Sequence, residues 1–122
     1  MTNEATAQSM VRLAASARGW KLWRNNVGVL TRPDGVPIRY GLANDSKAVN
    51  QNVKSADLIG IRPVVITPDM VGDVIGQFVS IECKRPGWKP SATDQHEAAQ
   101  MRWAEIVMLA GGHAIFSTGE IE

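Results

Sequence analysis

The C-terminal part of the chain constrains the fold most, because it reads as a strand, a long helix and a strand. Residues 77–84 form an apolar run rich in residues that favour strands. Residues 91–110 have helical spacing of apolar side chains and end at Gly111-Gly112, and residues 113–118 are apolar again. Strands joined in this order usually lie parallel, with a right-handed crossover between them. The sequence therefore predicts an α/β fold, with one mixed sheet flanked by helices.

The preceding residues predict one further helix, a short strand, a hairpin, a long polar loop and a second apolar strand. These elements are expected at residues 3–18, 20–23, 27–40, 41–56 and 58–67, respectively. The hairpin turn is expected at Pro33-Asp34-Gly35, because proline presets φ and glycine accepts positive φ. Met10 and Leu13 in the first helix, and Met101 and Met108 in the last, are predicted to face the core.

Composition limits the protein classes that need to be considered. The chain has 122 residues, which fits a single domain over residues 1–122, with 44% hydrophobic and 20% charged residues. The formal net charge is +1, so any nucleic-acid contact must rest on a local cluster of cations. One cysteine excludes an internal disulfide framework, and no apolar run is long enough to span a bilayer. With no signal-peptide pattern at the N-terminus, we expect a cytoplasmic protein without a membrane partner.

The strand at 77–84 carries an acid and a base two residues apart. Side chains alternate along a strand, so Glu82 and Lys84 are expected on one side, and Val79, Ile81 and Cys83 on the other, where they can pack. Cys83 is accordingly expected to be a small buried apolar residue, not a nucleophile. Taken alone, Glu82 and Lys84 could equally be an exposed ion pair of little energetic value.

A second acid, Asp57, stands where the 58–67 run begins. If the two strands are antiparallel neighbours, the carboxylates of Asp57 and Glu82 meet at one edge of the sheet. Two hard oxygen ligands suit Mg²⁺ or Mn²⁺, and the backbone carbonyl of Cys83 could be a further ligand. Lys84 could then orient the attacking water or hold the phosphate. The pattern predicts metal-dependent hydrolysis of a phosphodiester.

The ordered set of these motifs resembles the VRR-NUC branch of the PD-(D/E)xK nucleases. The resemblance covers residues 4–118 and rests on Arg24-Asn25-Asn26-Val27-Gly28, Asp57-Leu58-Ile59-Gly60, Ile81-Glu82-Cys83-Lys84-Arg85-Pro86, Gln100 and Gly111-Gly112. Ala56 replaces the proline that usually precedes the first acid, and Cys83 stands where valine is common.

This resemblance implies a restriction-endonuclease-like core and DNA cleavage that depends on Mg²⁺ or Mn²⁺. It implies that Asp57, Glu82 and Lys84 are the catalytic trio, that Gln100 supports them, and that Glu4 completes the metal shell. Glu4 could also simply complement the helix dipole, and Gln100 could be an ordinary polar helix position.

Small stand-alone members of this branch look like Holliday-junction resolvases, which act as dimers. Symmetric cleavage of two strands needs two sites, so a homodimer acting on branched DNA is expected. A flap or exonuclease activity without junction preference, or an inactive DNA-binding module of the same fold, remains an alternative.

Five cations, one aromatic residue and one asparagine mark candidate DNA contacts. A cation beside an aromatic ring, close to a phosphate-cutting site, is a common way to bind single strands, although such residues can also belong to a solvated loop. The candidates are Arg24, Asn25, Lys47, Lys54, Arg85, Trp88 and Lys89. His96 and His113 have no second ligand at metal spacing, so neither is expected to bind a metal.

Overall fold

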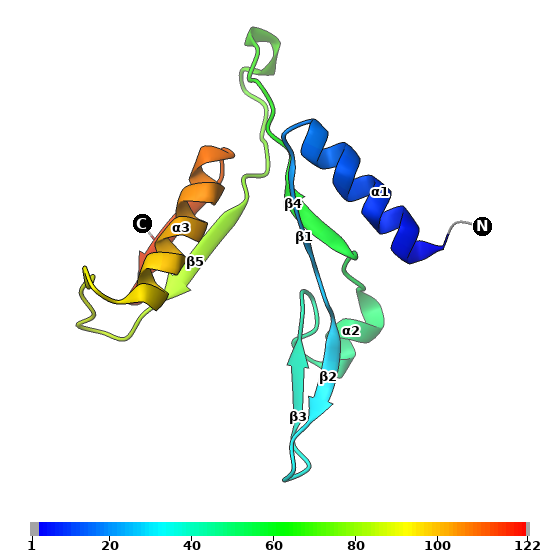
Figure 1. Ribbon diagram of the computed structural model, residues 1–122, viewed down its shortest axis with the longest axis vertical. Helices are drawn as coiled ribbons and strands as arrows, with labels where there is room; N and C mark the ends of the chain where they lie inside the picture. Colours follow the sequence, from blue (N-terminus) through cyan, green and yellow to red (C-terminus); the bar gives the residue numbers. More distant parts are fainter. Residues whose placement is uncertain (1–2, 122) are drawn as a thin grey trace. The chain divides into compact units, whose positions relative to one another are not determined.

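The computed structural model describes residues 3–121, and the chain divides into two compact units (Figure 1). The first unit is Met1–Arg18 with Leu22–Gly60, and the second is Gly19–Lys21 with Ile61–Glu122. Over the described range the structure is mixed α/β, with three α-helices and three two-stranded sheets. The α/β class is therefore confirmed, whereas the single mixed sheet expected from the sequence is not found among the described residues. The single-domain expectation stays a prediction.

The first unit begins with helix α1 (Glu4–Ala17), close to the predicted bounds. The helix starts there because the Oδ1 atom of Asn3 accepts a hydrogen bond of 2.9 Å from the Thr6 amide. The predicted apolar stripe is wrong as a core face within this unit, since Met10 and Leu13 are exposed.

The predicted hairpin is confirmed. Strands β2 (Gly28–Thr31) and β3 (Pro37–Tyr40) pair antiparallel, with Gly28 opposite Tyr40. The turn between them requires a glycine at residue 35, where φ is +86°. The Asp34 side chain adds a 3.0 Å hydrogen bond from the Val36 amide.

The segment 41–56 is more ordered than a polar loop, so that part of the prediction is wrong. It contains a short helix, α2 (Lys47–Asn52), whose first turn is capped by Ser46. Asn44 precedes it and is only 2% exposed. Its amide donates 2.8 Å hydrogen bonds to the carbonyls of Gly28 and Tyr40, which ties the segment to the hairpin.

A third sheet pairs β1 (Lys21–Arg24) with β4 (Leu58–Ile61), and all of its residues except Lys21 and Ile61 belong to the first unit. The predicted strand at 58–67 is too long, because β4 ends before Pro63, which has no amide hydrogen to give a ladder. Beyond it lies the short 3-10 helix η1 (Pro68–Met70). A hydrogen bond from the Thr67 hydroxyl, and then one from the backbone, lowers the pKa of Asp69 in this turn.

The second unit contains the strand–helix–strand arrangement that the sequence predicts. Strand β5 (Val79–Cys83) lies parallel to β6 (His113–Ser117), with Val79 opposite His113 and Cys83 opposite Ser117. Helix α3 (Gln95–Leu109) joins them, starts at an Asp94 cap, and packs against both strands.

Only part of the predicted helix stripe is buried in α3. Ala104 and Val107 are buried, whereas the expected core residues Met101 and Met108 are exposed. Gly112 must be a glycine, because a Cβ atom there would lie 2.6 Å from the Val107 side chain. Within residues 3–121, no helix is long and apolar enough to cross a membrane.

Candidate functional site

The predicted acid and base lie on the side of β5 that α3 covers. Burial alternates along the strand as expected: Glu82 is half-buried, whereas Ile81 and Cys83 on the opposite side are exposed. The prediction that the apolar side is packed, with Cys83 buried, is therefore wrong within this unit. Lys84 follows the strand, and its amide donates a 2.7 Å hydrogen bond to the Ser117 carbonyl, which continues the pairing with β6.

Gln100 meets Lys84, so the helix and the strand share one site. The Nζ atom of Lys84 donates a 2.7 Å hydrogen bond to the Oε1 atom of Gln100 and lies 3.9 Å from the Glu82 carboxylate. The Lys84 side chain is 17% exposed and that of Glu82 is 43% exposed. The ammonium is thus fixed by two partners, while the carboxylate keeps oxygen atoms open to solvent.

Two aromatic rings complete the surroundings of Lys84. Trp88 stacks on Phe116 with ring centroids 5.5 Å apart and planes inclined by 14°. The Lys84 ammonium lies 5.6 Å from the Trp88 centroid and 5.8 Å from the Phe116 centroid, within cation–π range. Trp88, which the sequence offered as a DNA contact, therefore has contacts inside its own unit.

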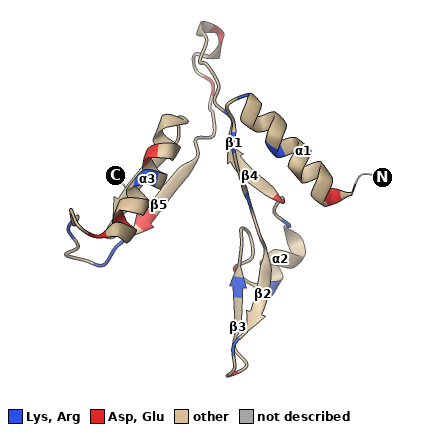
Figure 2. Cartoon of the chain, viewed as in Figure 1, with Lys and Arg blue, Asp and Glu red and all other residues tan. Residues whose placement is uncertain are grey.

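Glu97 anchors the loop that carries Trp88. It is 5% exposed, and its carboxylate accepts hydrogen bonds from the Ser91 amide at 2.9 Å and from the Trp88 indole at 3.4 Å. The backbone amide of Glu97 donates a 3.1 Å hydrogen bond to the Asp94 side chain, so Asp94 caps the N-terminus of α3. The loop cations Arg85 and Lys89 are exposed. Figure 2 colours the cations of the loop between β5 and α3 blue.

Asp57 stands exposed at the start of β4 in the first unit. Asn25 holds the segment before it: its amide nitrogen donates to Ser55 Oγ at 2.8 Å and to the Ala56 carbonyl at 2.9 Å. The backbone amide of Asn25 also donates a 2.8 Å hydrogen bond to the Asp57 carbonyl. The contacts of Asn25 are thus structural, and they position the acid.

The remaining candidates of the first unit are exposed. Glu4 is in the first turn of α1, Arg24 ends β1, Lys47 begins α2, and Lys54 follows α2. Their exposure leaves them available to a substrate.

The structure brings Glu82, Lys84 and Gln100 together in one unit, whereas Asp57 and Glu4 belong to the other. The expected pairing of β4 with β5 is not found: β4 pairs with β1, and β5 with β6. Across the described residues, no three Asp, Glu, His or Cys side chains gather as a metal site would require. The chemistry of the donors in the second unit still fits a hard cation, because Glu82 has open carboxylate oxygens.

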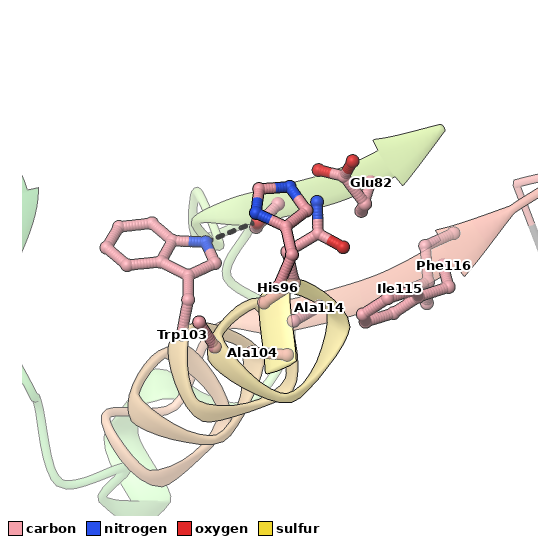
Figure 3. Close-up of a pocket in the computed structure, with 10 residues that line it drawn as sticks. Glu82, His96, Trp103, Ala104, Ala114, Ile115 and Phe116 are labelled. Atoms are coloured by element: carbon pink, nitrogen blue, oxygen red, sulfur yellow. Dashed lines mark hydrogen bonds between the residues drawn. The ribbon is translucent and has the colours of Figure 1, made fainter. Parts of the chain in front are cut away.

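A hollow of about 330 Å³ adjoins Glu82 and Gln100, between α3 and the β5–β6 pair (Figure 3). The Trp103 indole lies at it and donates a 2.8 Å hydrogen bond to Ser80 Oγ. Sequence reasoning missed this hollow and the anchoring role of Glu97. The signal was present in the helix periodicity, because His96, Gln100 and Trp103 recur at intervals of four and three residues and so share a face.

Comparisons with protein-family models, with curated proteins and with solved structures found no match to this chain.

Proposed function

We propose that this protein is a metal-dependent nuclease that hydrolyses phosphodiester bonds of DNA. The observation that supports this most is the half-buried Lys84 ammonium, held by Gln100 at 2.7 Å beside the partly exposed Glu82 carboxylate. A cation fixed next to an acid, at an edge that is still open to solvent, suits an anionic substrate such as a phosphodiester.

In the proposed hydrolysis, Lys84 and Gln100 act on the phosphate and the water, and the oxygen ligands hold the metal ion. Lys84 donates hydrogen bonds to a phosphate oxygen or to the attacking water, and Gln100 holds it in that orientation. In the second unit, Glu82 and the backbone carbonyl of Cys83 would hold Mg²⁺ or Mn²⁺. Such an ion neutralises charge on the phosphoryl group and makes hydroxide available near neutral pH.

The order of elements supports a restriction-endonuclease-like core of the VRR-NUC type. A helix, the Asp57 strand, the Glu82 strand, a crossover helix and a parallel strand follow one another, and Gln100 on that helix reaches Lys84. A single small domain supplies one site, so the proposal includes a homodimer when two strands of branched DNA are cut.

The test offers linear, flap, splayed and four-way DNA to the protein with Mg²⁺, Mn²⁺ or EDTA. We expect cleavage with a metal only, and Lys84→Ala should slow it roughly 10²–10³-fold, as loss of one charge-stabilising donor does. Lys21→Ala, which removes an exposed lysine of β1, is the matched control and should cleave normally.

The same substrates separate the alternatives. Preference for the four-way junction supports a resolvase, whereas equal cleavage of flap and linear ends supports a flap or exonuclease activity. DNA binding without cleavage under either metal would contradict the enzyme and leave an inactive binding module.

A further inference from the structure

The hollow beside Glu82 and Gln100 exists because small side chains face it from both layers. Ala99 and Ala104 of α3, and Ala114 of β6, line it, so the helix and the sheet leave space of about 330 Å³ between them (Figure 3). That volume falls within the range of small-molecule sites.

The remaining walls combine flat aromatic surface with hydrogen-bonding groups. The Trp103 and Phe116 rings and the His96 imidazole lie around the hollow. Trp103 is oriented by its 2.8 Å hydrogen bond to Ser80. Gln100 uses its oxygen for Lys84, and an amide group also carries two N–H donors that can bind a ligand. This chemistry suits a planar heterocycle with acceptors on its edge.

We propose that the hollow binds one unstacked nucleobase of the DNA strand whose phosphodiester lies at Glu82 and Lys84. This inference rests on the proposed nuclease function, and it names the substrate class: DNA with an unpaired nucleotide next to the reacting phosphodiester. A base inside a duplex must leave its stack to enter such a pocket, and that step costs least where the base is already unpaired, as at a flap or branch point.

Abasic substitution tests the pocket without any cleavage. A flap DNA carries a single abasic nucleotide, placed in turn at each position around the branch point, and its Kd is measured in EDTA at fixed salt. In the wild-type protein, one position should weaken binding by about five- to 150-fold, the loss that corresponds to one stacked base.

Filling the hollow should remove this dependence on the base. Ala99 is exposed and lies on α3, where leucine is well tolerated, so Ala99→Leu occupies the space from outside the core. This variant should bind intact flap DNA more weakly and show no further loss with the abasic strand. Ala98→Leu is the matched control, since the neighbouring Ala98 does not line the hollow, and it should behave like the wild type.

A second variant alters a different wall of the hollow, so that a folding defect in Ala99→Leu alone does not decide the test. Trp103→Leu removes the aromatic wall and should also abolish the abasic effect, and circular dichroism checks both variants for native helix content. The inference is overturned if no abasic position matters in the wild type, or if the loss persists in both variants. Cleavage without an abasic effect would overturn the pocket alone, whereas an abasic effect without cleavage would overturn the nuclease and leave the pocket.

Discussion

Lys84 has its position fixed by residues from three parts of the second unit. Gln100 comes from α3, Phe116 from β6, and Trp88 from the loop that Glu97 anchors. A lysine that follows a strand would otherwise sample many rotamers, so in the proposed function these contacts would reduce the entropy lost on binding a phosphate. The position of the Lys84 ammonium thus depends on side chains from a helix, a strand and a loop.

Trp88 should therefore affect cleavage through Lys84. We expect Trp88→Leu to slow single-turnover cleavage by about two- to 30-fold, which corresponds to the loss of one cation–π contact, and Trp88→Phe to retain most of the rate. Competitive acetylation of Lys84, read by mass spectrometry, should show faster labelling in Trp88→Leu. This readout does not depend on activity.

Trp20 offers a matched control for that experiment. Its ring lies 5.5 Å from the Arg62 guanidinium, a cation–π contact that involves none of the candidate site residues. Trp20→Leu should leave the labelling of Lys84 unchanged. Equal labelling of Lys84 in the wild type and Trp88→Leu would contradict the positioning role.

At the scale of elements, local chemistry was predictable and long-range pairing was not. The alternation of Ile81 and Glu82 follows from strand geometry and was predicted correctly. The caps that Asn3 and Asp94 provide are likewise explained by local side-chain chemistry. The partner of β4 could not be read from the sequence, because an apolar strand can pair with several others and the choice depends on residues far along the chain.

The structure of segment 41–56 also could not be predicted from its local composition. Its composition favours a loop. The Asn44 side chain nevertheless holds it against the hairpin by hydrogen bonds to the Gly28 and Tyr40 carbonyls, and Ser46 caps α2. The Asn44 Oδ1 atom also accepts a 2.8 Å hydrogen bond from Arg39. A polar residue with all of these partners can be buried at little cost, which composition alone does not reveal.

Removal of the Asn44 side chain should therefore destabilise the first unit. Asn44→Ala removes the donor of two part-buried hydrogen bonds to the Gly28 and Tyr40 carbonyls and the acceptor for Arg39, and we expect the free energy of unfolding to fall by about 1–3 kcal/mol. Urea denaturation followed by circular dichroism measures the change. The control is Asn52→Ala at an exposed position of α2, which should change stability little. A similar loss of unfolding free energy in both variants would contradict a specific stabilising role of the Asn44 hydrogen bonds.

At the scale of the whole molecule, both units leave apolar side chains exposed. Leu13 of α1 and Ile81 of β5 are examples, and exposed apolar surface of this kind is a feature of proteins that associate. The proposed homodimer gives a functional reason for association, because a two-fold pair of sites can cut two strands of a branched DNA symmetrically.

Mixed dimers distinguish paired sites from independent ones. When wild-type protein and Lys84→Ala are co-incubated to allow subunit exchange, dimers with one active site should cut one strand of a four-way junction, so nicked junctions accumulate on denaturing gels. Mixing with Lys21→Ala, which keeps both sites active, should leave the product ratio unchanged. If each subunit acts alone, dilution with Lys84→Ala only slows the reaction and the ratio of nicked to fully cut junctions stays constant. That result, or a monomeric mass by analytical ultracentrifugation at the assay concentration, would contradict the dimer.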